Sequence, residues 1–261
     1  MSGVADRDTA LALNSLLGNE PNAAMIEWAV AGGMLRFDCA AEIAIGGAEA
    51  SVAVGERSVK ALTPFQLSED EELTVKRIVH GRFLLIAVRG GIDVPVVLGS
   101  RSTLLSAAFG GLDGRRLRQG DQLPIGHAMT SASRDRESSD RPIERRPRDT
   151  IRVMRGPQAA LFDADAWLAF LDTPFTVSVT SDRTGYRLEG AILRHSGAPS
   201  LPSEPACVGA VQIPDGGSPI VLMNDGPTVG GYPKIAVIRS SDLSRFAQLA
   251  PGDVVRFELG D

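Results

Sequence analysis

Short apolar runs recur along most of this chain, and their spacing favours strands over helices. Between residues 25 and 88 the runs alternate with glycine and acidic turns, and they read MIEWAVAGG, LRFD, EIAIGG, ASVAVG, ELTVKRIV and RFLLIAVRGG. Residues 83–88, FLLIAV, are apolar without interruption, which is typical of a strand buried on both faces. Many short strands with few helices between them predict a mainly β fold, either a barrel or a sandwich.

The N-terminal segment has a different period. Leu13, Leu16 and Leu17 fall on one face of a helix, and we expect Asp8 to cap it. The segment 18–21, GNEP, should end this helix because glycine and proline both interrupt helical backbone.

A second β-rich half begins near residue 150 with IRVMRG. Further strands are expected at PFTVSVT, VGAVQIP, PIVLM, KIAVIR and DVVRFEL. Helices are predicted at 163–171, with Asp163 as the N-cap, and at 241–249. A short internal similarity, LRQGDQLPIG at 117–126 against LAPGDVVRFE at 249–258, suggests a Gly-Asp turn that leads into the last strand of each half.

The two halves are separated by a polar stretch at 130–149, TSASRDRESSDRPIERRPRD. Its arginines, acids and prolines cannot bury enough surface to offset the entropy of ordering. We therefore expect a linker or loop there, between a first unit at 1–129 and a second unit at 150–261. The nearly balanced charge argues against a nucleic-acid-binding arm.

Composition excludes several classes of protein. The net charge of -5 argues against a nucleic-acid binder, which needs a concentrated cationic surface. Two cysteines, Cys39 and Cys207, cannot form a disulfide framework, and we expect both to be reduced and buried. The three histidines stand far apart, so no metal site is expected. Without a signal-like N-terminus or a long apolar stretch, we expect a cytoplasmic protein with no membrane partner.

Four segments combine glycine with charged or hydroxyl side chains in a way that a core does not require. They are GSRST at 99–103, SDRTGYRLEG at 181–190, LPSEPACVGAVQIP at 201–214 and NDGPTVGGYPKIA at 224–236. In the first, Ser100, Arg101 and Ser102 can offer several donors to an anion, although a surface turn explains the cluster equally well.

The second and fourth segments also leave alternatives open. Arg183, Arg187 and Glu189 would share one side of an extended segment, as anion-binding groups or as an ion-paired exposed strand. Gly230-Gly231 predicts a tight turn with positive φ, followed by a strand that begins at Lys234. No Walker sequence, G-x-S-x-G elbow or biotin-attachment Met-Lys-Met is present.

Together and in this order, the four segments resemble a family of carboxyltransferase-like proteins that includes KipA, the C component of 5-oxoprolinase and allophanate hydrolase subunit 2. The resemblance covers essentially the whole chain and is densest in GGIDVPVVLGSRST, FGGLDGRRLRQGDQLPIG, SDRTGYRLEG and GAVQIPDGGSPIVLMNDGPTVGGYPKIA. It implies two cyclophilin-like β-barrel units with a few short helices.

The resemblance also implies an activity. Members work in an ATP-dependent 5-oxoprolinase-type or carboxyltransferase-type complex that acts on a small amide such as 5-oxoproline, urea or allophanate. The implied partners are a KipI-like protein (allophanate hydrolase subunit 1, the B component of oxoprolinase) and a LamB/YcsF-type protein (the A component). No covalently bound cofactor is implied, but ATP in the complex and carboxybiotin on a partner are. The alternative is a non-catalytic regulator, a KipA-like antagonist of a kinase inhibitor.

By this resemblance, catalytic roles are expected for Glu189, Glu204 and Lys234. Substrate-binding roles are expected for Ser100, Arg101, Ser102, Arg183, Arg187, Gln212, Asp225, Thr228, Gly231 and Tyr232. Two departures from the family pattern stand out. Members usually begin with an additional segment, so either the start codon is misassigned or the first unit is incomplete at its N-terminus. Pro227 stands where many members have Gln-Thr-Thr before Gly-Gly-Tyr, which leaves the substrate open.

Overall fold

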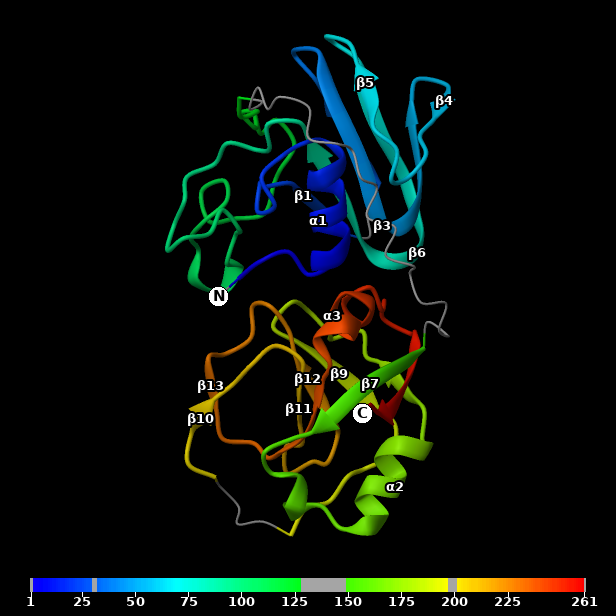
Figure 1. Cartoon of the computed structure of the whole chain (residues 1–261), viewed down its shortest axis with the longest axis vertical. Coiled ribbons are helices and arrows are strands. Elements are labelled where there is room, and N and C mark those ends of the chain that lie inside the picture. The colour runs from blue at the N-terminus through cyan, green and yellow to red at the C-terminus, as the bar shows by residue number, and fades with distance from the viewer. Residues whose placement is uncertain (1, 30–31, 128–148, 197–200, 261) are drawn as a thin grey trace. The chain divides into compact units, whose positions relative to one another are not determined.

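The computed structural model describes residues 2–29, 32–127, 149–196 and 201–260. Two compact units divide the chain, Ser2–Ile143 and Glu144–Asp261, and we call them the first and second unit (Figure 1). The linker expected at 130–149 lies outside the described residues except for Asp149.

The mainly β class is confirmed. The α-helices within the described residues are short, namely α1 (Arg7–Leu16), α2 (Ala164–Asp172) and α3 (Ser240–Ala247). Two 3-10 turns accompany them, η1 (Leu105–Ala107) and η2 (Ala159–Leu161). None of the described helices is long and apolar enough to cross a membrane.

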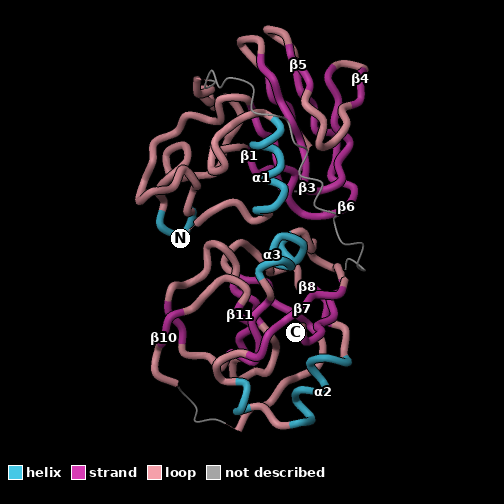
Figure 2. The backbone as a smooth tube through the Cα atoms, in the orientation of Figure 1, coloured by secondary structure: helices cyan, strands magenta, loops and turns pink. Residues whose placement is uncertain are grey.

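The first unit is built on a six-stranded antiparallel sheet. Its strands are β1 (Ile26–Ala29), β2 (Gly33–Arg36), β3 (Ala41–Val54), β4 (Arg57–Ser58), β5 (Phe65–Leu67) and β6 (Glu72–Val88). The order is β1-β6-β3-β4, with β2 paired to β6 and β5 to β3. Residues 89–127 then run mostly as loop, which Figure 2 shows in pink.

Two strands of this sheet are longer than the sequence pattern indicated. The runs EIAIGG and ASVAVG form one strand, β3, and the runs ELTVKRIV and RFLLIAV form one strand, β6. Gly47 (φ 89°) and Gly81 (φ 90°) lie where the β3–β6 register shifts. Glycine at these points therefore forms bulges within long strands, where the sequence had suggested turns between short ones.

The expectation for residues 83–88 is confirmed, because all six are buried. Leu84 and Ile86 belong to the larger core of the first unit, whereas Leu85 and Ala87 pack with α1. Figure 1 shows α1 lying against the sheet. A strand with cores on both faces has no polar alternation, which is why it is apolar throughout.

The start of α1 corrects one expectation. Asp6 is the N-cap, and its carboxylate accepts the backbone N–H of Thr9 at 3.1 Å. Asp8 lies instead in the first turn, where a negative charge still complements the helix dipole. Gly18, with φ at 67°, follows the end of the helix as expected.

The second unit contains a closed barrel with the strand order β11-β12-β9-β8-β15-β7-β14. The strands are β7 (Thr150–Arg155), β8 (Phe175–Val177), β9 (Gly185–Glu189), β11 (Ala210–Gln212), β12 (Ile220–Leu222), β14 (Lys234–Ile238) and β15 (Val254–Leu259). A separate two-stranded ribbon pairs β10 (Glu204–Pro205) with β13 (Val229–Gly230). The barrel expected for each unit is thus found in the second. In the first unit α1 covers one face of the sheet described above.

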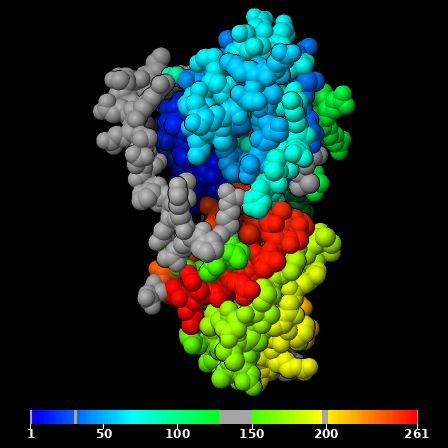
Figure 3. Space-filling model, turned by 90° about the vertical axis from the view of Figure 1, so that its right-hand side faces the viewer, coloured from blue at the N-terminus to red at the C-terminus, as the bar shows by residue number. Residues whose placement is uncertain are grey.

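Both helices of the second unit pack by their apolar faces. Asp163 caps α2 as expected, accepting the N–H of Ala166 at 2.8 Å. The helix lies on the surface of the unit against β15, where Figure 3 shows it in yellow-green beside the red C-terminal strand. In α3, Phe246 and Ala247 are fully buried, and the hydroxyl of Tyr186 donates to the carbonyl of Ala247 at 2.7 Å.

The internal similarity corresponds to two like turns. The carboxylate of Asp121 accepts the N–H of Arg118 at 2.7 Å, and that of Asp253 accepts the N–H of Ala250 at 2.8 Å. The second turn leads into β15. The first leads only to an isolated bridge at Ile125, so the expected last strand of the first unit is not formed.

The cysteines correct another expectation. Cys39 and Cys207 are both free thiols, but both are exposed. Each lies in a connection beside charged or small residues, so burial predicted from residue type alone is wrong here.

Candidate functional site

A buried lysine opens strand β14. The side chain of Lys234 is only 3% exposed, and a buried ammonium group requires a partner. Its Nζ donates to Oε1 of Glu204 at 2.5 Å. Glu204 comes from the β10–β13 ribbon, so this ion pair ties the ribbon to the barrel.

Gln158, which was not predicted from the sequence, binds both Glu204 and Lys234. Nε2 of Gln158 donates to the same Oε1 of Glu204 at 2.7 Å, and Oε1 of Gln158 accepts the backbone N–H of Lys234 at 3.1 Å. Gln158 follows β7 in the sequence RGPQ, where nothing in the local pattern distinguishes it from a surface residue. It holds both members of the ion pair in place.

These contacts set the charge of Glu204. The hydrogen bond from Lys234, followed by the one from Gln158, holds the pKa of this carboxyl below its usual value. The carboxylate is therefore ionised near neutral pH. It can hold a cation or accept a proton, but it is unsuited to donate one.

Gln212 lies next to Lys234, because the two residues are paired between β11 and β14. Its side chain is buried, with only 4% of the residue exposed, and Nε2 has no hydrogen-bond partner within the described residues. We call Gln158, Glu204, Gln212 and Lys234 the barrel-end cluster, because β7 and β11 end where β14 begins.

The glycines of the neighbouring loop correct a prediction. Neither Gly230 nor Gly231 has a positive φ. Both positions are instead crowded. A Cβ at Gly230 would lie 2.8 Å from Nε2 of Gln212, and one at Gly231 would lie 3.0 Å from the carbonyl oxygen of Leu201. Glycine is needed here for close approach rather than for turn geometry.

Arg183 and Asp225, both expected to bind substrate, bind each other. The guanidinium meets the carboxylate in a two-point contact, Nε to Oδ2 at 3.0 Å and Nη2 to Oδ1 at 3.1 Å. The Asp225 side chain is only 6% exposed. This contact holds the two side chains together in the loop that precedes β9, and their substrate-binding roles stay predictions.

Arg187 and Glu189 lie on the outer face of β9, while Tyr186 and Leu188 point into the barrel. The shared side predicted from their spacing is therefore present. Both line a hollow on the second unit, together with Pro214, Gly216, Ser218, Pro219 and Ile220, and no residue of the barrel-end cluster lines it. Glu189 is thus not brought together with Glu204 or Lys234.

Thr228 and Tyr232 flank the ribbon and are exposed. The carbonyl of Thr228 accepts the N–H of Ala206 at 2.9 Å, which continues the ribbon by one further bond.

The remaining candidates lie in the first unit. Nε of Arg101 donates to the carbonyl of Val94 at 3.0 Å, and its Nη2 lies 3.9 Å from Asp93. Oγ of Ser100 accepts the N–H of Ser102 at 3.1 Å, so part of this segment's donor capacity is used locally.

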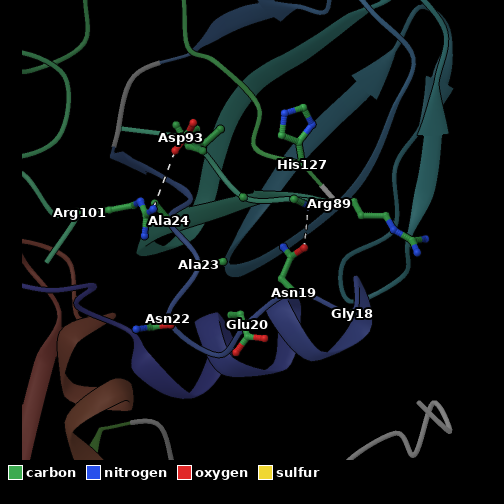
Figure 4. A pocket seen from close by; sticks show the side chains of 13 residues that line it. Gly18, Asn19, Glu20, Asn22, Ala23, Ala24, Arg89, Asp93, Arg101 and His127 are labelled. Carbon is green, nitrogen blue, oxygen red and sulfur yellow. Dashed lines mark hydrogen bonds and ion pairs between the residues drawn. The ribbon is translucent and has the colours of Figure 1, made fainter. Parts of the chain in front are cut away.

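Arg101 also lines a cavity of about 230 Å³, which Figure 4 shows with Asn19, Asp93 and His127 around it. The amide of Asn19 is fixed by two hydrogen bonds to the backbone at the end of β6. Its Oδ1 accepts the N–H of Gly90 at 2.8 Å, and its Nδ2 donates to the carbonyl of Val88 at 2.8 Å. The residues that line the cavity are Gly18, Asn19, Glu20, Asn22, Ala23, Ala24, Arg89, Gly90, Gly91, Ile92, Asp93, Arg101 and His127. Within the described ranges, no group of three or more His, Cys, Asp or Glu side chains is arranged to hold a metal ion.

A sequence model of the carboxyltransferase domain, subdomain A and B, matches residues 1–259. The chain belongs to this carboxyltransferase family. It is 37% identical to the C component of 5-oxoprolinase from Escherichia coli over 255 residues, covering 98% of this chain and 81% of that protein. It is 33% identical to the component of the same name from Haemophilus influenzae, with the same coverage of both chains. The family resemblance inferred from the sequence is confirmed.

A solved structure has the same fold over the whole of this chain. The structure of K. lactis urea amidolyase matches 100% of this chain with a TM-score of 0.90 and 27% identity. This chain covers only 17% of that much longer protein. It is therefore similar to one part of that protein, while it covers 81% of the length of the 5-oxoprolinase components.

Proposed function

We propose that this chain is a subunit of an ATP-dependent assembly of the 5-oxoprolinase or carboxyltransferase type. The substrate is a small amide such as 5-oxoproline, urea or allophanate. The similarity to a 5-oxoprolinase component and to urea amidolyase supports this proposal. Both names refer to substrates in which a carbonyl carbon is bonded to nitrogen.

The observation that carries the proposal is the barrel-end cluster. A lysine ammonium and a carboxylate are held together where three barrel strands begin or end, beside a buried amide whose Nε2 has no partner in the described part of the chain. An unsatisfied buried donor costs roughly 1–3 kcal/mol. A fold has no structural need for an unpaired donor, so one that lies beside a buried ion pair supports a binding site there.

The cluster suits chemistry at an amide carbonyl. Negative charge develops on the carbonyl oxygen when an amide is attacked, and the ammonium of Lys234 is placed to stabilise such charge. Glu204, kept ionised by its lowered pKa, can accept a proton from the reacting group. Gln158 acts as a positioning residue, because it holds Glu204 and the backbone of Lys234.

The assembly includes a KipI-like partner and, for 5-oxoproline, a LamB/YcsF-type protein. ATP is a reactant of the assembly, and carboxybiotin, in the carboxyltransferase case, is a substrate delivered on a partner chain. A cytoplasmic location remains a prediction from the sequence.

Reconstitution tests the proposal. The chain is co-expressed with the KipI-like and LamB/YcsF-type proteins of its own genome, and ATP hydrolysis is measured with and without 5-oxoproline. We expect a co-purifying complex with 5-oxoproline-dependent turnover and no turnover by the isolated chain. A parallel assay supplies urea with a biotin-carboxylase partner.

The outcomes separate the classes of function. A complex with the KipI-like protein that turns over neither substrate would replace the enzymatic proposal by the regulatory alternative. Robust turnover by the isolated chain would contradict its dependence on an assembly.

A further inference from the structure

The carboxamide of Gln212 is an unusual group to leave without a hydrogen bond. It ends β11, is buried, and its Nε2 has no partner within the described residues. Nearly all buried polar groups in folded proteins are paired, so an exception requires a reason. The neighbouring polar groups are already engaged, because Gln158, Glu204 and Lys234 bind one another.

A glycine of the ribbon packs directly against the same group. Gly230 of the ribbon lies so close that a Cβ there would stand 2.8 Å from Nε2 of Gln212. The ribbon is paired through only two residues on each strand, Glu204 with Gly230 and Pro205 with Val229. Glu204 also links it to Lys234. A small displacement of this ribbon would open the amide of Gln212 to a ligand, directly beside the ion pair.

The chemistry of the group specifies what it binds. A carboxamide carries an N–H donor beside a C=O acceptor, and both point the same way. Its complement is another amide whose N–H and C=O also lie on one side, as in a lactam ring or in urea. An open-chain secondary amide is trans and points these groups in opposite directions.

We propose that Gln212 binds the cis-amide edge of the ligand through two hydrogen bonds when the ribbon that packs on it at Gly230 is displaced. This inference rests on the proposed function, in which the substrate is a small amide. It adds a rule of specificity, because lactams and ureas with a free N–H fit whereas N-methylated lactams do not. The bound carbonyl would then lie beside Lys234, which is paired with Gln212 across the two strands.

Ligand binding to the full chain tests this independently of turnover. Binding of 5-oxoproline, 2-pyrrolidinone and their N-methyl analogues is measured by ligand-observed NMR with wild type and Gln212→Met, whose side chain has a similar length without the amide. For wild type we expect the free N–H lactams to bind at least about tenfold more tightly than the N-methyl analogues. For Gln212→Met we expect this preference to fall to about twofold or less.

Stability provides the second readout. Because Nε2 has no partner to lose, Gln212→Met should leave the unfolding temperature unchanged or raise it. Gly230→Ala should weaken lactam binding, because its Cβ would press on Nε2, whereas Gly216→Ala adds a Cβ in open space and serves as the matched control.

The inference is overturned if Gln212→Met keeps the preference for free N–H lactams, or if wild type binds neither lactam nor urea. It is also overturned if Gln212→Met lowers the unfolding temperature as a lost structural hydrogen bond would. Failure of the proposed function looks different, since the chain would bind lactams through Gln212 while the reconstituted assembly hydrolysed no ATP with 5-oxoproline.

Discussion

Two arginines of one segment, Arg183 and Arg187, have different surroundings in the folded chain. The guanidinium of Arg183 makes a two-point contact with the buried carboxylate of Asp225, whereas Arg187 projects from the outer face of β9. From the sequence alone the two residues could not be distinguished, because both are arginines in the same short polar segment. Asp225, which lies 42 positions away from Arg183, separates their roles.

Replacing the two arginines should therefore affect stability unequally. Arg183→Ala leaves the carboxylate of Asp225 without its partner and should lower the free energy of unfolding by about 1–3 kcal/mol. Lysine should not restore it, because a point charge cannot replace the planar fork. Arg187→Ala should change stability by less than about 0.5 kcal/mol. Urea denaturation measures all three, and equal losses for Arg183→Ala and Arg187→Ala would contradict the assignment.

Asp121 gives a prediction about pH. Two hydrogen bonds from the guanidinium of Arg115, at 2.8 and 2.9 Å, together with the N–H of Arg118, lower the pKa of this carboxyl to about 2. The ordinary value is 3.8, so the folded state favours the ionised form. The resulting stabilisation is complete above pH 3.8 and is lost as the pH falls towards 2.

A carbon-13 NMR titration of the aspartate carboxyls measures this pKa. We expect a midpoint near 2 for Asp121 in wild type and a return towards 3.8 in Arg115→Met. An unshifted midpoint in wild type would show that the Arg115 contact is absent in solution.

Among single residues, the sequence identified only those whose type already suggests chemistry. Glu204 and Lys234 were selected and meet in the structure, and Gln212 lies beside them. Gln158 was missed, because its role depends on where the chain places it after β7 and not on any local motif. Glu189 was selected by type but is exposed on the outer face of β9, because strand alternation turns it outward, and within the described residues it makes no hydrogen bond or ion pair with the cluster.

At the scale of elements, the structural role of glycine was the hardest feature to predict from the sequence. Gly47 and Gly81 punctuate apolar runs, which suggested strand ends, but pairing between β3 and β6 continues through both. The helices were easier, since Asp163 caps α2 as the sequence indicated. Helical period and cap are local signals, whereas bulge positions are set by the partner strand.

The bulge at Gly81 can be tested by one substitution. Gly81 has a φ of 90°, a conformation that costs an L-residue about 1–3 kcal/mol, so Gly81→Ala should lower the free energy of unfolding by that amount. Gly216→Ala, in open space and without positive φ, should have little effect. If chemical denaturation shows the two variants to be equally stable, the bulge is not formed as described.

At the scale of the whole molecule, the chain divides into two compact units between Ile143 and Glu144. The sequence predicted a linker at 130–149, because segments without apolar side chains cannot belong to a core, and those bounds stay a prediction. For the second unit the sequence pattern predicted a mainly β fold, but it did not predict the order in which the barrel strands pair. The closure of this barrel depends on β7 pairing with both β14 and β15, contacts between residues far apart in sequence.

Limited proteolysis tests the division. Trypsin should cut first between Arg134 and Arg148. This stretch offers several arginines as cleavage sites, and it has few apolar residues that could bury them. Two fragments that match the two units should accumulate. First cleavage within β6, after Arg77 or Arg82, or within β9, after Arg187, would contradict the boundary.

The most direct test of the barrel-end cluster replaces Lys234 in the reconstituted assembly and measures 5-oxoproline-dependent ATP hydrolysis. We expect Lys234→Met to reduce kcat by at least about 100-fold, because it removes the cation that, in our proposal, stabilises charge on the amide oxygen. The exposed Lys60→Met is the matched control and should retain wild-type rates. Assembly with the partners and the unfolding temperature are measured for both variants. If Lys234→Met assembles normally and its kcat stays within about threefold of wild type, the cluster is not the functional centre of this chain.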